Sequence, residues 1–405
     1  MNAQQAIARL PPFLVPFFTF SYPTAPPAVP DSFPNSSYYN TGPLDACIII
    51  SCIAVMAVLR DVARLYLLEP FARWKLTRDI RLQRNAKTTI TNGKTNGVTN
   101  GHTATSDSAN GETKENGEAK ATGVEYGNGH AVLSATNKHA NGNEHIIYAQ
   151  GIALSRKEAK RIHRSVLRFA EQGWSVISYT FVWCFGLYVH SQLPTRVLDP
   201  IDAWLNYPHI PLAGPVKFYY LLETALYCHQ ILIINAEARR KDHWQMMTHH
   251  VITIALMVGS YSCFYTRVGC LVMLIMDWCD IWLPLAKMLR YLSLTTACDI
   301  AFVLFMVSWA ITRHVLFILV IKSTWDAQYL IPHLWDPVRG QPMSAKLYWS
   351  LLAMIIALQV IQMMWFWRIC RVAYRVVSGK GAEDERSDDE DDDSYEGEGE
   401  EKRGR

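Results

Sequence analysis

The sequence lacks the short motifs that mark several large classes of enzyme. Its 405 residues include nine cysteines, mostly in or beside apolar segments, with no C-x-x-C pair and no regular spacing. This pattern indicates neither a disulfide framework nor a zinc knuckle, so we expect the thiols to serve in apolar packing. A glycine-rich phosphate loop and a G-x-S-x-G elbow are also missing, so nucleotide-motif chemistry and triad hydrolysis have no support in the sequence.

Histidine boxes are missing as well. The di-iron desaturases and hydroxylases of membranes bind their metal through several H-x-x-x-H or H-x-x-H-H boxes. The membrane region of this chain offers one close histidine cluster. We therefore expect no metal site.

Long apolar runs, in contrast, are abundant. Half of the residues are apolar and 12% are aromatic, yet the mean hydropathy is +0.03, so strongly apolar and strongly polar segments must alternate. A helix needs about 20 apolar residues to cross a hydrocarbon core of roughly 30 Å. We predict an all-α polytopic membrane protein with about seven transmembrane helices, at 44–66, 174–193, 216–234, 248–265, 268–286, 300–321 and 347–367.

Charged residues interrupt two of these windows, so a count one lower or higher stays open. Arg60 and Asp61 lie in the first window, and Arg313 and His314 lie in the sixth. The apolar N-terminal patch at 11–20, PPFLVPFFTF, is short and broken by prolines. It predicts neither a spanning helix nor a signal peptide.

Lysines and arginines cluster on one side of the predicted spans. Cytoplasmic loops carry the excess of these residues, so we place the N-terminus in the lumen and the C-terminus in the cytosol. With this orientation the sequon at Asn35 is lumenal and is a candidate for glycosylation. The basic flanks follow spans one, three and seven and precede span two: Arg73, Lys75, Arg78, Arg81, Arg84, Arg156, Lys157, Lys160, Arg161, Arg164, Arg168, Arg239, Arg240, Lys241, Arg368, Arg371 and Arg375.

Composition divides the rest of the chain. A lumenal segment at 1–43 precedes the first transmembrane helix with its basic flank at 44–84. The Asn/Gly-rich segment at 85–145 is typical of a disordered cytosolic insertion. The tail at 378–405 is acidic and equally polar, and in it Ser387, which is followed by Asp-Asp-Glu, is a candidate for phosphorylation by an acidophilic kinase.

The acidic tail hides a basic body. The first 382 residues carry 35 Lys and Arg against 23 Asp and Glu, a formal charge of +12. Such a body suits anionic lipid headgroups and phosphorylated substrates at the cytosolic face, although positive-inside topology alone explains most of the excess.

Two adjacent histidines, His249 and His250, lie where a basic cluster gives way to an apolar segment, in the stretch ARRKDHWQMMTHHVIT. Polar side chains are costly to bury in hydrocarbon, so a pair at the mouth of a membrane helix indicates a functional site. The two side chains point about 100° apart, so one can face a substrate while the other supports it. For the isolated His190, His229 and His314 we favour core packing.

Two aspartates, Asp277 and Asp280, lie inside the otherwise apolar run LIMDWCDIWLPLAKMLRYL. At positions i and i+3 they share one face of a helix, and Lys287 lies two turns beyond Asp280 toward the cytosol. One carboxylate can therefore orient an imidazole, while Lys287 lies near the mouth of the site.

In combination these residues resemble the Lag motif of the eukaryotic ceramide synthases, within the TLC domain family. The upstream run RSVLRFAEQGWSVISYTFVWCFG also resembles the start of that domain, which we place at 165–377. His243, Trp278 and Cys279 depart from the residues common in the family. The homeobox-like segment of many animal members is absent, and the Asn/Gly insertion and the acidic tail are fungal in style. The shared motif residues are Arg239 to Asp242, His249, His250, Thr253, Ser260, Tyr261, Asp277, Asp280 and Lys287.

The resemblance implies six helices around a lipid-lined cavity in the endoplasmic reticulum membrane. It also implies transfer of a fatty acyl group from acyl-CoA to the amine of a sphingoid base, sphinganine or phytosphingosine. Acyl-CoA is then a substrate, no cofactor is expected, and membrane lipids are the remaining partners. Association with itself or with related subunits is left open, and no nucleic acid is expected. Arg239, Arg240, Lys241 and Lys287 would hold the CoA phosphates on the cytosolic side.

The chemistry suits the residues. A thioester is already activated, so the enzyme must supply a base for the ammonium form of the amine, align two lipids and stabilise an oxyanion. A histidine, whose ordinary pKa is about 6.5, fits the proton transfer. Asp277 or Asp280 would accept from its other ring nitrogen and so fix the tautomer. We favour His249 as the reacting imidazole and His250 as its partner, because His249 lies nearer the cytosolic mouth.

Two routes and one alternative function stay open at this point. His249 can act as a general base, or it can attack the thioester and form an acyl-imidazole. TLC-type proteins also include lipid-sensing and translocation-associated membrane factors without acyltransferase activity. A seven-span receptor gives no reason for clustered His and Asp side chains.

Overall fold

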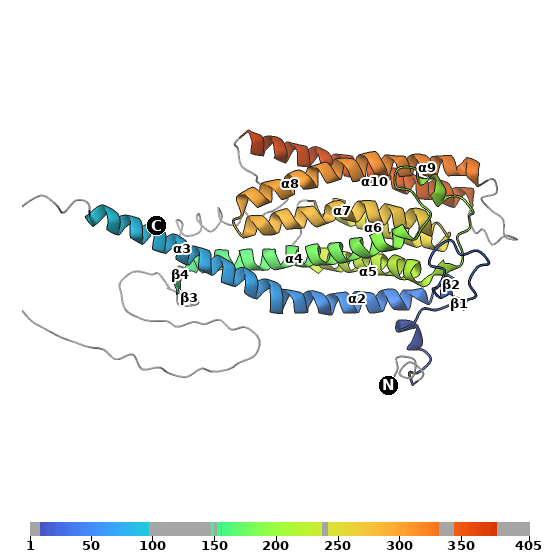
Figure 1. The fold of residues 1–405 in the computed structure, drawn as a ribbon, viewed down its shortest axis with the longest axis horizontal. Helices are drawn as coiled ribbons and strands as arrows, with labels where there is room; N and C mark the ends of the chain where they lie inside the picture. The colour runs from blue at the N-terminus through green and yellow to red at the C-terminus, as the bar shows by residue number, and fades with distance from the viewer. Residues whose placement is uncertain are drawn as a thin grey trace, which may run out of the picture. The chain divides into compact units, whose positions relative to one another are not determined.

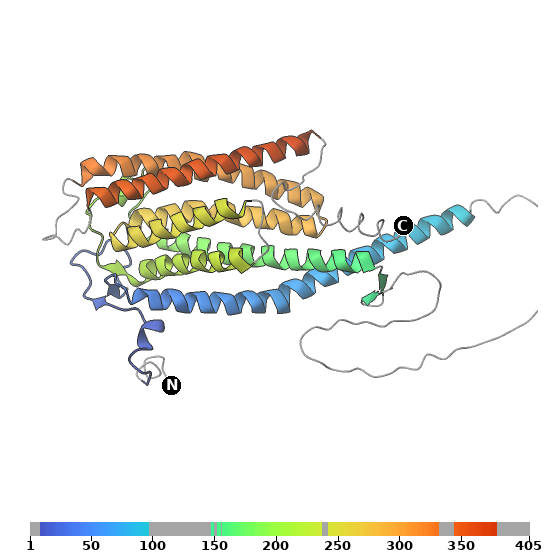
Figure 2. The same cartoon turned by 180° about the vertical axis from the view of Figure 1, so that it is seen from behind.

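The structure, a computed structural model, describes residues 9–96, 147–149, 152–154, 156–236, 242–331 and 344–378. Long helices dominate it, as Figure 1 and the reverse view in Figure 2 show. The contacts divide the chain into two compact units, Leu68–Ala170 and the remainder. The predicted all-α class is confirmed.

In the larger unit the helices lie side by side along one direction (Figure 1). Each predicted apolar window overlaps one or more helices. The first window, 44–66, covers α2 and most of η2, and the sixth, 300–321, covers parts of α8 and α9 with η4 between them, without a break. The windows at 174–193 and 248–265 extend two and three residues beyond the ends of α4 and α6. The helices are α2 (Asp45–Val62), the second half of α4 (Arg156–Ser191), α5 (Gly214–Ala236), α6 (His243–Ser262), α7 (Thr266–Tyr291), α8 (Thr295–Trp309), α9 (Phe317–Leu330) and α10 (Ala345–Val377), with short 3₁₀ helices η1 (Val15–Phe17) and η3 (Pro200–Ala203) and π-helices η2 (Ala63–Leu68) and η4 (Ala310–Leu316).

The smaller unit contains α3 (Glu69–Asn96), the first half of α4 and a two-stranded antiparallel sheet of β3 (Ile147–Ala149) and β4 (Ile152–Leu154). An ion pair of 2.9 Å between Arg84 and Glu158 joins its two helices. The helix α3 continues beyond residue 85, where the sequence predicts the start of the insertion. The rest of that insertion, and the acidic tail after Ser378, lie outside the described residues.

The three helices α5, α6 and α7 occupy the middle of the larger unit. α5 packs against α2, α6 packs against α5 and α10, and α7 packs against α8. Tyr219 and Leu226 of α5 and Leu271 of α7 are almost completely buried in the apolar core. Because these central helices carry the histidines and carboxylates singled out above, the candidate site lies inside the bundle.

Four helical segments among the described residues are long and apolar enough to cross a bilayer: Asp45–Ala86, Thr266–Tyr291, Thr295–Leu330 and Ala345–Arg375. The windows in α4, α5 and α6 also form helices, but their polar residues lower the hydropathy. The span count of seven therefore stays a prediction. Arg60 and Asp61 do not break the first helix, since α2 runs through them to Val62.

The sequence does not predict the small antiparallel sheet at one end of the bundle. Its strands β1 (Pro23–Thr24), β2 (Tyr38–Tyr39) and β5 (Leu212–Ala213) pair in the order β1-β2-β5. The sheet joins the N-terminal segment to the start of α5. Strands of two residues carry no alternating pattern, so sequence periodicity cannot predict them.

Beside this sheet, a buried lysine holds the N-terminal segment against the bundle. The Nζ atom of Lys217 lies 2.7 Å from Asp45 Oδ1 and donates to the carbonyl oxygens of Ser21 and Asn40 at 3.0 and 2.8 Å. Asp45 Oδ2 accepts from the Tyr261 hydroxyl at 2.7 Å. Lys217 is 0% exposed and Asp45 is 2% exposed, so neither charge can exchange its partner for water.

Breaking this pair should destabilise the fold. Asp45→Asn removes the negative charge and leaves Lys217 uncompensated, which costs about 3–5 kcal/mol for a buried pair. We expect a clear fall in the thermal unfolding temperature of the purified chain in detergent. Arg196→Gln is the control, because it breaks the exposed Arg196–Asp202 pair, worth less than about 1 kcal/mol. Equal unfolding temperatures for the two variants would contradict the assignment.

A buried histidine lies in the loop between α4 and α5. Burial, together with the nearby positive charge of Arg267, lowers the pKa of His209 to about 4. Its Nε2–H donates to the carbonyl oxygen of Leu205 at 2.8 Å. The neutral imidazole is therefore part of the folded loop.

This histidine should make the fold sensitive to acid. The folded-state pKa lies below the unfolded value, so between pH 6.5 and pH 4 the unfolded chain binds more protons and stability falls as the pH drops. For His209 the loss at pH 5 is about 2 kcal/mol. Unfolding temperatures at pH 7.5 and pH 5 measure it. The difference should shrink in His209→Gln, and an unchanged difference would show that another group is responsible.

Candidate active site

The two histidines lie in the second turn of α6, which begins directly after Asp242. His250 points into the bundle and is 4% exposed, whereas His249 is only partly buried. Their ring centroids are 5.4 Å apart and the ring planes are nearly perpendicular. The two side chains therefore face different neighbours, as the helical spacing predicts.

Both ring nitrogens of His250 are engaged. Nδ1 lies 2.8 Å from the carbonyl oxygen of Met246, and Nε2 lies 2.8 Å from the Gln230 side chain. The amide of Gln230 in turn lies 2.6 Å from the Tyr179 hydroxyl. A chain of hydrogen bonds thus runs from α4 through α5 to α6.

Two proton arrangements satisfy this chain. In one, His250 is an imidazolium that donates from both nitrogens. In the other, the Tyr179 hydroxyl donates to the Gln230 oxygen, the Gln230 amide donates to Nε2, and the neutral ring donates from Nδ1. Either arrangement uses both nitrogens, so His250 has none left for a substrate.

His249 differs, because its Nδ1 atom is buried without a hydrogen-bond partner among the described residues. Its ring instead contacts the Trp365 ring of α10 in an edge-to-face arrangement, with centroids 5.1 Å apart. A buried polar atom without a partner is costly in a folded protein. Of the two adjacent histidines, His249 is therefore the one whose ring nitrogens are not all engaged by the protein.

Asp280 pairs with an arginine that the sequence flagged only as an interruption of a span. Arg313, in the π-helix η4, lies 2.7 Å from Asp280 and donates to Cys279 Sγ at 2.7 Å and to the Met276 carbonyl oxygen at 3.1 Å. Its guanidinium also lies over the Trp309 ring, 4.4 Å from the centroid. π-Helical turns are frequent at functional sites, and this one places the arginine in the core.

The expected hydrogen bond between a carboxylate and an imidazole is not found among the described residues, and this part of the prediction is wrong. The guanidinium takes the Asp280 carboxylate because a charged donor is a stronger partner than a neutral ring. Gln230 and the α6 backbone orient His250 instead.

Asp277 faces a second acid, Glu223 of α5, which sequence reasoning missed. Both side chains are 0% exposed and contact each other. Apart from each other and Tyr219, the two carboxyl groups have no hydrogen-bond donor among the described residues. Two carboxylates side by side would repel, and a shared proton removes this repulsion. Glu223 interrupts the apolar run YYLLETALY, which is the same signal that marked Asp277.

The other candidates are less informative. Lys287 is partly buried in α7, two turns beyond Asp280. Asn35 is exposed in a turn. Arg239, Arg240, Lys241 and Ser387 lie outside the described residues, so their roles stay predictions.

The isolated histidines have local neighbours. His190 Nδ1 lies 3.3 Å from the Thr195 hydroxyl, and His314 Nδ1 lies 2.9 Å from the Gln359 amide. His229 is 4% exposed within α5. These surroundings fit the packing role that the sequence suggested.

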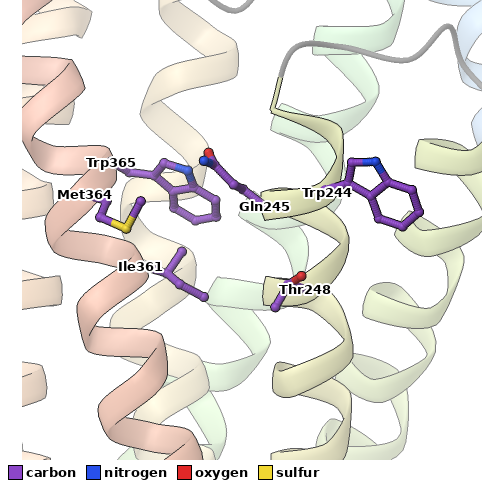
Figure 3. A pocket seen from close by; sticks show the side chains of 6 residues that line it. All are labelled: Trp244, Gln245, Thr248, Ile361, Met364 and Trp365. Carbon is purple, nitrogen blue, oxygen red and sulfur yellow. The ribbon is translucent and has the colours of Figure 1, made fainter.

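A pocket of about 230 Å³ lies between α6 and α10, next to His249. Figure 3 shows Ile361 of α10 extending toward Thr248 of α6 and Trp365 extending toward α6 beside Gln245, while Met364 lies along α10. Trp244 completes the lining. The pocket lining is mostly apolar, and only the Trp365 ring lies between the pocket and the His249 ring.

Comparison with known families gives a match to the TLC domain model over residues 168–371, half of the chain. The chain belongs to the TLC domain family. The predicted resemblance is thereby confirmed, and the histidines, the aspartates and Arg313 all lie within the matched TLC domain.

Curated relatives of this TLC domain protein are named as ceramide synthases or sphingosine N-acyltransferases. The chain is 36% identical over 259 residues to ceramide synthase FUM18 of Gibberella moniliformis, which is 56% of this chain and 60% of the relative. It is 36% identical over 236 residues to sphingosine N-acyltransferase lag1 of Schizosaccharomyces pombe, 58% and 60% of the two chains. Human ceramide synthase 5 is 30% identical over 225 residues, 55% of each. The match spans about 60% of the length of the first two relatives.

The difference between the two histidines of the TLC domain can be measured without an activity assay. Modification of imidazoles by diethylpyrocarbonate, followed by peptide mass spectrometry, should label His249 faster than His250. Gln230→Leu should raise the rate at His250 about fivefold, because it removes a hydrogen bond worth about 1 kcal/mol. Gln328→Leu, at an exposed glutamine of α9, is the control. An unchanged His250 rate in Gln230→Leu would contradict the proposed chain of hydrogen bonds.

Proposed function

We propose that this TLC domain protein is a ceramide synthase, which transfers a fatty acyl group from acyl-CoA to the amine of a sphingoid base. The observation that supports the proposal is the difference in hydrogen bonding between the two histidines. His250 is fixed through Gln230 and Tyr179, and His249 keeps an unpartnered nitrogen beside an apolar pocket. The names of the relatives supply the reaction class.

In the direct route, His249 accepts a proton from the ammonium group of the base. The freed amine attacks the thioester carbonyl, the C–N bond forms, and the tetrahedral intermediate expels CoA as a thiolate. The imidazolium gives its proton to the thiolate, and the nitrogen that attacked loses its remaining extra proton to water. The products are an amide, CoA and one proton, and the histidine returns to its starting state.

In the covalent route, a nitrogen of His249 attacks the thioester first. CoA leaves as a thiolate and an acyl-imidazole remains, which the amine then attacks to release the amide and the histidine. His250 supports the reacting ring in both routes. Arg313 holds the negative charge of Asp280 away from direct contact with the rings.

The remaining assignments follow from the basic flanks. Arg239, Arg240, Lys241 and Lys287 would bind the CoA phosphates on the cytosolic side of the endoplasmic reticulum membrane, with the N-terminus in the lumen. Acyl-CoA and a sphingoid base are the substrates, and no cofactor takes part. Glycosylation at Asn35 and phosphorylation at Ser387 are further proposals of the same kind.

Loss of either histidine should abolish most activity. In microsomes supplied with acyl-CoA and sphinganine, His249→Ala and His250→Ala should each lower turnover at least about a hundredfold. His249→Ala removes the general base or nucleophile, whose usual contribution has this size, and His250→Ala removes the ring that supports it. His190→Asn is the control, because His190 lies at the far end of α4, and it should retain activity. Wild-type levels of product in both variants would rule out this site. A wild-type chain that makes no amide would favour the lipid-sensing alternative.

The two routes differ when acyl-CoA is supplied alone. The covalent route gives an added acyl mass on the intact protein and releases CoA without the base, with ping-pong kinetics. The adduct should be absent in His249→Ala. If no adduct forms and no CoA is released, the direct route stands.

A further inference from the structure

The pocket between α6 and α10 opens at the outer surface of the bundle. Of its lining residues, Trp244 is 71% exposed and Met364 is 47% exposed, whereas Trp365 is 5% exposed. The pocket therefore has an outer rim that faces the surroundings and an inner wall that faces the core. Trp365 is the only buried residue of the lining (Figure 3).

The inner wall is also the neighbour of the reactive histidine. The Trp365 ring lines the pocket and lies 5.1 Å, centroid to centroid, from His249. The Trp365 Nε1–H is buried and has no acceptor among the described residues. An indole N–H can only donate, so the ring that contacts His249 carries a hydrogen-bond donor without an acceptor among the described residues.

The rim of the pocket carries a positive charge. Arg368 of α10 donates from Nη1 to the side-chain oxygen of Gln245 at 3.0 Å, and Gln245 lines the pocket. The occupant must therefore have an apolar part, an anionic part and an acceptor for the indole N–H. At about 230 Å³ the pocket is smaller than the roughly 300 Å³ at which sites for whole drug-sized ligands begin, so it suits one end of a longer molecule.

We propose that the pocket between α6 and α10 binds the thioester end of acyl-CoA and that the Trp365 N–H donates a hydrogen bond to the oxyanion formed there. This inference rests on the proposed function. Attack on the thioester carbonyl, by the amine or by His249, moves the carbonyl electron pair onto oxygen. The indole stabilises that charge until the C–S bond breaks and CoA leaves as a thiolate.

A matched pair of tryptophans tests the catalytic part. Trp365→Phe keeps the aromatic ring and removes the N–H. Trp282→Phe makes the same change at a partly buried residue of α7 that also has an Nε1 without a partner among the described residues, but that does not line the pocket. We expect kcat to fall about 10²- to 10³-fold in Trp365→Phe, while KM for both substrates and the kcat of Trp282→Phe stay within about threefold of wild type. Equal kcat values for the two variants would overturn the role of Trp365.

A second pair tests the pocket itself. Ile361→Trp fills the pocket, whereas Val360→Trp places the same side chain on the neighbouring residue, which is 53% exposed and lies outside the pocket lining. The probe is an acyl-CoA thioether, which cannot react, added to the full chain in detergent. Ile361→Trp should weaken its binding at least about tenfold, and Val360→Trp should bind as wild type does. Equal binding by the two variants, or no binding by wild type, would overturn the pocket.

These measurements separate the two proposals. If wild type binds the thioether but makes no amide, the proposed function fails while the pocket stands. If wild type makes amide and Ile361→Trp binds the thioether normally, the proposed function stands and the pocket fails. Unfolding temperatures of Trp365→Phe and Trp282→Phe show whether a loss of kcat reflects a loss of fold.

Discussion

The ion pair between Asp280 and Arg313 determines the arrangement of the rest of the site. Two opposite charges buried in a membrane protein are stable only when each satisfies the other and further hydrogen bonds complete the shell. Arg313 meets this condition through Asp280, the Cys279 sulfur, a backbone carbonyl and the face of Trp309. As a result, α7 and the π-helix η4 are held together, and the carboxylate that could have bonded a histidine is occupied.

The functional difference between the two histidines follows from that arrangement. With Asp280 occupied, His250 takes its support from neutral groups, Gln230 and its own backbone, which fix the ring without adding a charge next to it. His249, one residue earlier, faces the tryptophan on α10 and has no comparable support. His249 and His250 thus differ in chemistry because the helix directs one side chain toward α10 and the other toward α5.

The sequence predicted the helices well because a span must be long and apolar, and this requirement is local. The histidines and aspartates could be singled out for the same reason, since each is a polar group in an apolar run. The sequence does not predict which of these polar side chains contact each other. Arg313 meets Asp280 across 33 residues, and a one-residue shift in a π-helix decides where it points. Glu223 carried the same local signal as Asp277 and was overlooked. The short sheet has no periodic pattern to read.

The buried lysine near the start of α5 has a consequence for the borders of the domain. The family match begins at residue 168, yet Lys217 within it takes its counter-charge and both of its carbonyl partners from residues before α3. A chain cut down to the matched region would leave an ammonium group in the interior with nothing to neutralise it. The smallest piece of this protein that can fold is therefore set by electrostatics rather than by homology, and it must include the first helix.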